Sequence, residues 1–118
     1  MHELSIALEI IDILNGEITR RKIRGIDEVG LRIGMLTGVD PDSLEFGFKA
    51  ATMDSPLSDV ELNIRLIPIG GICRKCRACF TVEDFVILCP ECGSTEVDIT
   101  QGEELDIEYI VEHDSSSG

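Results

Sequence analysis

Four cysteines arranged in two pairs are the residues of this sequence best suited to chemistry. Each pair has Cys-x-x-Cys spacing, and twelve residues separate Cys73 and Cys76 from Cys89 and Cys92. A Cys-x-x-Cys turn supplies two thiolates from one tight loop, and a tetrahedral zinc ion takes four such ligands. Because the protein would fill all four positions, no open position is left for a reactive water. The spacing therefore predicts a structural zinc site rather than a catalytic one.

The fifth cysteine leaves an alternative open. Cys79 completes a Cys-x-x-Cys-x-x-Cys run of the kind found in iron–sulfur proteins, but nine residues separate it from Cys89 where the ferredoxin run has three. Four unligated core cysteines are a second alternative, although paired spacing rarely arises from packing alone. We favour zinc and interpret Cys79 as a spare thiol. The basic residues Arg74, Lys75 and Arg77 would partly neutralise the thiolates.

The amino terminus, Met1-His2-Glu3, is the second candidate metal site. The terminal amine, the His2 backbone nitrogen and the His2 imidazole can close two chelate rings, and the Glu3 backbone nitrogen can complete a plane of four nitrogens. Square-planar nitrogen ligation selects nickel(II) or copper(II). We expect Met1 to be retained, because initiator removal generally requires a small second residue. The ordinary alternative is a solvent-exposed histidine without a metal.

Composition narrows the functional classes. The 118 residues are 43% hydrophobic, enough for one modest core, and the net charge of −13 opposes binding to nucleic acid or to anionic membranes. No apolar run approaches the roughly 18 residues of a membrane span, and no signal peptide is recognisable. We therefore expect a cytoplasmic protein whose cysteines bind metal rather than form disulfides. We expect no enzyme, because no Ser/His/Asp or Cys/His constellation is present.

The elements that position these residues follow from hydrophobic periodicity. Helical spacing predicts a helix over residues 4–19, and Asp40 followed by Pro41 predicts the start of a second helix that runs to about Met53. Period-two alternation predicts strands over residues 26–35, 60–66 and 105–111. Two helices packed on a three-stranded sheet would bury every apolar stripe. The predicted fold class is α+β, with an inserted zinc-ribbon-like module of four cysteines.

The same patterns predict burial and domain boundaries. We expect the first helix to be buried over most of its circumference and the second to point Leu44, Phe48 and Ala51 inward. Between the cysteine pairs we expect a hairpin with a small apolar face formed by Phe80, Val82, Phe85, Ile87 and Leu88. The predicted nickel-binding domain comprises residues 1–69 and 95–112, the zinc module residues 70–94, and a disordered tail residues 113–118. His113 would belong to that tail and be inert.

The sequence as a whole resembles the HypA/HybF family of hydrogenase nickel-incorporation proteins. The resemblance rests on Met-His-Glu-Leu-Ser opening the first helix, Asp-Pro-Asp-Ser-Leu opening the second, and the cysteine pairs ending in Cys-Pro-Glu-Cys-Gly, and it covers about residues 1–112. It implies a nickel metallochaperone with Met1, His2 and Glu3 as nickel ligands. It also implies zinc held by Cys73, Cys76, Cys89 and Cys92.

The resemblance further implies two partners, a maturation GTPase and the large subunit of NiFe hydrogenase. We expect a monomer or a homodimer. The alternatives are a zinc-ribbon adaptor for protein interactions, which would usually show a basic face, and a small iron-containing electron carrier, which would be coloured.

Overall fold

The computed structural model describes residues 3–113. The elements are, in order, α1 (Glu3–Arg21), β1 (Ile26–Gly34), the short 3-10 helix η1 (Met35–Thr37), α2 (Pro41–Thr52), β2 (Glu61–Ile67), β3 (Gly70–Cys73), β4 (Cys79–Thr81), β5 (Val97–Gln101) and β6 (Leu105–Glu112). Both predicted helices and all three predicted strands are present. Strands β3, β4 and β5 were not assigned from the sequence.

The chain divides into two compact units. Within the described residues, the first contains 3–31, 39–64 and 107–113, and the second contains 32–38 and 65–106. The second unit is longer than the predicted module of residues 70–94, because β5 pairs with β3 and the N–H groups of Gly34 and Leu36 donate to the carbonyls of Glu104 and Gly102. The four cysteines all lie in this second unit.

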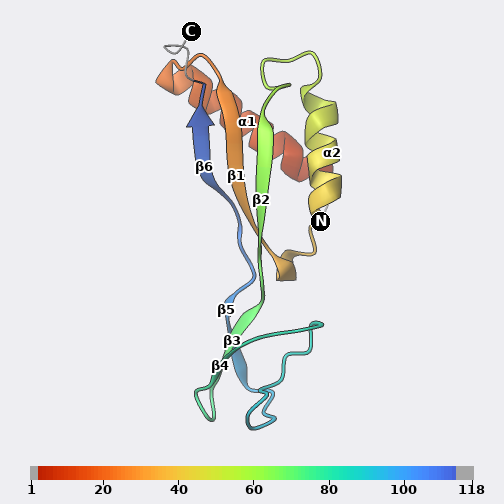
Figure 1. Ribbon diagram of the computed structural model, residues 1–118, viewed down its shortest axis with the longest axis vertical. Helices are drawn as coiled ribbons and strands as arrows, with labels where there is room; N and C mark the ends of the chain where they lie inside the picture. The colour runs from red at the N-terminus through yellow and green to blue at the C-terminus, as the bar shows by residue number, and fades with distance from the viewer. Residues whose placement is uncertain (1–2, 114–118) are drawn as a thin grey trace. The chain divides into compact units, whose positions relative to one another are not determined.

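The first unit combines the two helices with the sheet of strand order β2-β1-β6 (Figure 1). The helices pack against each other, and Gly47 on α2 brings that helix close to Leu4 and Ala7 on α1. The largest side chains of the core, including Leu14, Phe48 and Leu57, are almost fully buried. The predicted α+β class, with two helices on a three-stranded sheet, is confirmed.

Burial of α1 is narrower than the sequence predicts. Its buried residues are Ile6, Ala7, Ile10 and Leu14, which form one stripe. Leu4, Leu8 and Ile13, by contrast, are about half exposed, at 54%, 52% and 46%. A helix that is apolar almost all round still buries only the side that faces its neighbours, and periodicity does not say which side that is.

The start of α2 agrees with the prediction. Asp40 is the N-cap, its side chain accepts a hydrogen bond from the Asp42 backbone N–H at 3.2 Å, and Pro41 is the first helical residue. Near the other end, Ala51 is exposed and Thr52 is buried in its place. The Thr52 hydroxyl donates to the Phe48 carbonyl at 2.8 Å, so a polar side chain is buried without an unsatisfied group.

The second unit is built on an antiparallel sheet of strand order β4-β3-β5. The hairpin of β3 and β4 pairs Ile72 with Cys79, so the first cysteine pair lies in its turn. The predicted apolar face is largely wrong, because Val82 is buried whereas Phe85, Ile87 and Leu88 are exposed. The returning chain, residues 86–89, forms no strand with β4.

The described residues contain no helix with the length and hydropathy that crossing a membrane requires.

Candidate metal centre

Two loops of matching backbone geometry carry the four cysteines, the first knuckle (residues 73–78) and the second knuckle (residues 89–94). In each, the backbone N–H of the first cysteine donates to the carbonyl five residues later, at 2.9 Å for both Cys73 to Ala78 and Cys89 to Ser94. In each, that cysteine's carbonyl accepts from the N–H four residues later, from Arg77 or Gly93, again at 2.9 Å. The sequence thus folds the same local turn twice.

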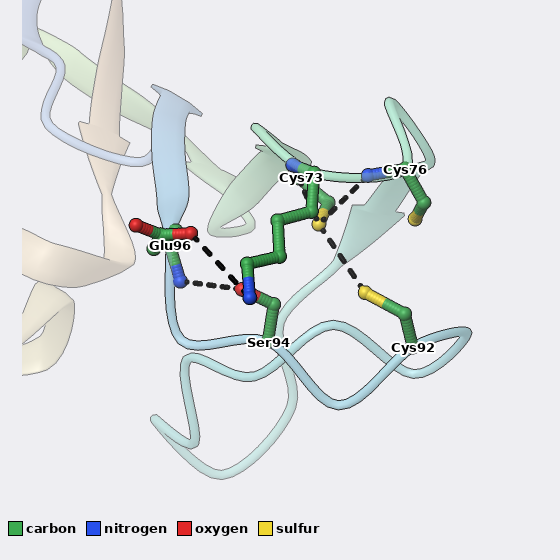
Figure 2. Close-up of polar contacts among 6 residues, drawn as sticks. Cys73, Cys76, Cys92, Ser94 and Glu96 are labelled. Carbon is green, nitrogen blue, oxygen red and sulfur yellow. Dashed lines mark hydrogen bonds and ion pairs between the residues drawn. The ribbon is translucent and has the colours of Figure 1, made fainter.

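The two knuckles bring their four sulfurs together. The Sγ atoms of Cys73 and Cys92 are 3.5 Å apart, as are those of Cys76 and Cys89, and all four lie within 4.8 Å of one another. A tetrahedral zinc ion with Zn–S bonds of about 2.3 Å holds its sulfurs about 3.8 Å apart. Because the donor set and the spacing both match, the residues fit zinc. Figure 2 shows the sulfurs of Cys73 and Cys92 facing each other from separate loops.

Backbone N–H groups prepare the cysteines for the charged form. The N–H of Cys76, labelled in Figure 2, and the N–H of Lys75 point at the Cys73 sulfur at 3.5 and 3.4 Å and lower the pKa of Cys73 to about 6. Burial raises the pKa of Cys89, but N–H donation from Cys92 and Glu91 outweighs it, so this pKa is lowered as well. A metal needs thiolate ligands, and these donors stabilise thiolates.

The other cysteine of each knuckle behaves in the opposite way. The Ala78 N–H lowers the pKa of Cys76, but hydrogen bonding with the sulfurs of the other three cysteines, Cys89 first, and burial together outweigh it and raise that pKa to about 12. The Ser94 N–H lowers the pKa of Cys92, but the contacts with the Cys73 and Cys89 sulfurs and burial together outweigh it, so this pKa is raised as well. Because a metal takes the cysteines as thiolates, zinc binding displaces the protons of these thiols and is favoured as the pH rises.

Cys79 takes no part in this group. It is exposed on β4, and among the described residues the sulfurs that converge are those of Cys73, Cys76, Cys89 and Cys92. This arrangement favours the zinc interpretation over the iron–sulfur run, which would need Cys79 as a ligand.

The basic residues of the first knuckle have acidic partners that the sequence analysis did not identify. Arg74 forms an ion pair with Asp98 on β5 at 3.4 Å, and Lys75 lies 3.9 Å from Glu96, just before β5. The Arg74 backbone N–H also donates to the Glu96 carbonyl at 2.9 Å. Arg74 and Lys75 therefore tie the first knuckle to the start of β5, whereas the sequence predicted only that they neutralise the thiolates.

Of the predicted nickel ligands, Met1 and His2 lie outside the described residues, and Glu3 is the first residue of α1. The Glu3 carboxylate accepts a hydrogen bond from the Asp40 backbone N–H at 3.1 Å. This donor, followed by the N–H of Glu3 itself, lowers the pKa of the Glu3 carboxyl. The residue next to the terminus is therefore anchored at the start of α2.

His113, assigned to the tail by the sequence analysis, is held at the end of β6. Its backbone N–H donates to the Gly25 carbonyl at 2.9 Å, and its Nδ1 lies 2.8 Å from the Asp27 carboxylate. The rest of the predicted tail, residues 114–118, lies outside the described residues.

Fold and site together define the class: a small α+β protein with a four-cysteine metal centre in its second unit. A protein family described as "Hydrogenase/urease nickel incorporation, metallochaperone, hypA" matches residues 1–111. The chain belongs to this HypA family, which is a family of metallochaperones rather than of enzymes.

Individual proteins agree with the family match. The chain is 39% identical over 111 residues to the hydrogenase maturation factor HypA of Desulfatibacillum aliphaticivorans, covering 93% of this chain and 85% of the relative. It is 34% identical over 110 residues to that of Desulfitobacterium hafniense, covering 93% and 96%.

Two solved structures share the fold. The solution structure of the Ni metallochaperone HypA from Helicobacter pylori matches with a TM-score of 0.65 and 24% identity, over 95% of this chain and 97% of that one. A second structure, described as the solution structure of HypA protein, matches with a TM-score of 0.70 and 23% identity, over 96% and 97%.

Proposed function

We propose that this protein is a nickel metallochaperone that binds Ni(II) at its N-terminus and delivers it for NiFe hydrogenase maturation. The observation that carries the proposal is the match to the HypA family over residues 1–111, which include Met1-His2-Glu3. The proposed nickel ligands are the Met1 amine, His2 and the Glu3 backbone nitrogen. The proposed partners are a maturation GTPase and the hydrogenase large subunit, in the cytoplasm.

The position of Glu3 supports this assignment. The first four N–H groups of a helix have no acceptor within the helix, and Glu3 is the first residue of α1. A metal can therefore take the Glu3 nitrogen without breaking a helical hydrogen bond. The anchored Glu3 carboxylate also gives the terminus a defined point of attachment.

A carrier must release its cargo as well as bind it. The imidazole and the α-amine have ordinary pKa values of about 6.5 and 7.7–8.0, so protons compete with nickel near neutrality. A site at the end of the chain can also exchange its ligands stepwise with an acceptor. We therefore propose delivery by ligand exchange, with nickel affinity that falls as the pH falls.

Calorimetric titration of Ni(II) into protein with its native start tests the nickel site. His2→Ala should weaken nickel binding by more than roughly tenfold, because it removes a direct ligand. The matched control is His113→Ala, which removes the only other histidine and should bind nickel like the wild type. Unchanged affinity in the His2→Ala protein would contradict the proposal and leave the adaptor function as the better account.

We further propose that the four-cysteine centre holds zinc, and that zinc has both a structural role and a regulatory role in partner docking. Bound zinc would cross-link the two knuckles. Cys76→Ser should release zinc, measured by metal analysis, whereas Cys79→Ser should retain it. If Cys76→Ser loses zinc but keeps partner binding and nickel transfer, the regulatory role is wrong and zinc is structural only.

A further inference from the structure

The four sulfurs of the metal centre form two close pairs, and each pair joins the first knuckle to the second. Cys73 and Cys92 supply one pair, and Cys76 and Cys89 supply the other, with Sγ–Sγ distances of 3.5 Å in both. The S–S bond of a disulfide is about 2.05 Å long, so each pair lies only about 1.5 Å from bonding distance. A shift of this size needs small side-chain rotations rather than a new fold.

Solvent access differs between the two members of each pair. Cys76 and Cys92 are exposed, whereas Cys73 and Cys89 are buried, at 0% and 1% exposure. In Figure 2 the sulfur of the exposed Cys92 faces that of the buried Cys73 across the gap between the loops. An oxidant from solvent therefore meets the exposed cysteine first, and the buried cysteine of the other knuckle is placed to react with the product.

Four cysteines can pair in more than one way, and the contacts between their sulfurs select one pairing. The close contacts correspond to the disulfides Cys73–Cys92 and Cys76–Cys89. The fifth cysteine, Cys79, lies outside the group of sulfurs that converge within residues 3–113. We therefore expect oxidation to connect the two knuckles at two points rather than to close a bond within either knuckle.

We propose that the four-cysteine centre is a redox switch, in which a hydroperoxide converts the zinc-bound thiolates into the disulfides Cys73–Cys92 and Cys76–Cys89 and thereby releases the metal. The proposal rests on the zinc site of the proposed function and adds regulation by oxidation to it. The two disulfides connect the same knuckles that zinc connects. The second unit therefore keeps its fold when the metal leaves, and oxidation changes its metal content rather than its architecture.

One molecule of hydrogen peroxide oxidises each pair. The Cys92 thiolate attacks one peroxide oxygen, the O–O bond breaks and hydroxide leaves, so that sulfenic acid forms on Cys92. The Cys73 thiolate then attacks the sulfenic sulfur, which forms the S–S bond and expels a second hydroxide. Both hydroxides take up protons to give water, and the two sulfurs have transferred two electrons to the peroxide. Cys76 and Cys89 react in the same way, and zinc dissociates because its ligands are no longer thiolates.

The test treats zinc-loaded, full-length protein with hydrogen peroxide and follows zinc release with a metal-binding dye. We expect complete loss of zinc, with about two peroxides consumed for each zinc released. Peptide mass mapping without reduction identifies the linkages, because cleavage after Arg74 or Lys75 and after Glu91 separates all four ligand cysteines. It should show Cys73–Cys92 and Cys76–Cys89. A dithiol reductant followed by added zinc should restore the zinc content.

Hydrogen exchange distinguishes this oxidised form from protein that has merely lost its metal. Strands β3, β4 and β5 should stay protected in the oxidised, zinc-free protein, whereas reduced protein stripped of zinc by a chelator should lose protection there. Cys79→Ser is the matched control, because it removes the exposed thiol outside the group. It should release zinc at the wild-type rate and form the same two linkages.

Four results would overturn the switch while leaving the proposed zinc site intact. These are zinc retained after peroxide treatment, disulfides within a knuckle, disulfides that include Cys79, and loss of protection in β3, β4 and β5 of the oxidised protein. Protein that binds no zinc before peroxide is added overturns the zinc site and the switch together. Nickel titration of the reduced protein reports separately on the nickel site.

Discussion

Arg77 and Gly93 occupy equivalent positions in the two knuckles, and both have left-handed backbones, with φ of 65° and 76°. At this position the backbone N–H donates to the carbonyl of the first cysteine of the knuckle, which requires the left-handed conformation. Glycine adopts it freely, whereas a residue with a Cβ is strained. The second knuckle therefore has the sequence that the turn prefers, and the first tolerates arginine.

Gly93→Ala should therefore destabilise the zinc-loaded protein by about 1 kcal/mol in urea unfolding and speed zinc transfer to a competing chelator. An added Cβ would meet no atom within 4 Å, so the cost is backbone strain alone. Gly16→Ala is the control, because it lies in α1 with equally open surroundings and should raise stability by up to about 1 kcal/mol. Equal effects at the two sites would contradict this account.

Arg32 and Asp106 form a two-pronged ion pair in the second unit, with nitrogen–oxygen distances of 2.9 and 2.7 Å. The Arg32 side chain lowers the pKa of Asp106, so the pair stabilises the folded protein above the unfolded pKa of about 3.9. That contribution is lost as the pH falls through the lowered value. Because both side chains are partly exposed, solvent screening keeps it small.

Asp106→Asn should consequently cost about 0.5 kcal/mol near neutral pH, and the difference from the wild type should vanish in acid. Urea unfolding of both proteins over a series of pH values measures this difference in the free energy of unfolding. Zinc release at low pH affects both proteins alike, so it does not contribute to the difference. Asp98→Asn, which removes the longer pair with Arg74, should cost less. A difference that grows as the pH falls would have the wrong sign for this mechanism.

At the scale of elements, the close approach of β1 to β6 depends on Gly30. A Cβ at Gly30 would overlap the ring of Tyr109. The Tyr109 hydroxyl donates to the Glu28 carboxylate and accepts from Asn63 at 2.7 Å, which holds the ring in place across the strands. The pKa of Tyr109 is raised, chiefly by the hydrogen bond to Glu28.

Gly30→Ala should destabilise the protein by about 1–3 kcal/mol, because the ring must leave its position. Tyr109→Ser removes the ring, so the double variant should be more stable than the sum of the two single effects predicts. Gly25→Ala is the control, because its Cβ would meet His113 at an ordinary 3.8 Å. If the effects of the two single variants on the free energy of unfolding simply add in the double variant, the contact with the Tyr109 ring is not what makes Gly30→Ala destabilising.

At the scale of the whole molecule, the two units differ in how much apolar core they contain. The first buries many large residues, including Leu14, Leu44 and Phe48. In the second, the buried apolar residues other than cysteine are Ile33, Ile67, Ile69 and Val82. A structural zinc supplies roughly 10–16 kcal/mol of apparent folding free energy in small modules. We therefore expect the second unit to depend on the metal far more than the first.

Removal of zinc by a chelator should abolish hydrogen-exchange protection in β3, β4 and β5 while α1 and α2 remain protected. Cys73→Ser should have the same effect without a chelator, and Cys79→Ser should leave all segments protected. Exchange measured by mass spectrometry resolves these segments. Loss of protection in both units at once would show that they fold as one cooperative body.

Local chemistry made much of this protein predictable from its sequence. The spacing of the cysteine pairs predicted the group that the structure brings together, and Asp40 with Pro41 predicted the start of α2. Period-two alternation located the three strands of the first sheet. Each of these signals depends on residues close together in the chain, so the sequence alone is enough to recognise it.

Other features depend on contacts between distant segments, and only the tertiary structure decided them. Leu4 and Leu8 are exposed because of where the neighbours of α1 lie, and Phe85 is exposed because residues 86–89 do not pair with β4. The partners of Arg74 and Lys75 come from more than twenty residues away, at Asp98 and Glu96. The sequence by itself determined the group of four cysteines and the helices and strands of the first unit. Burial and charge pairing required the fold, because periodicity shows which face of an element is apolar but not which segment covers that face.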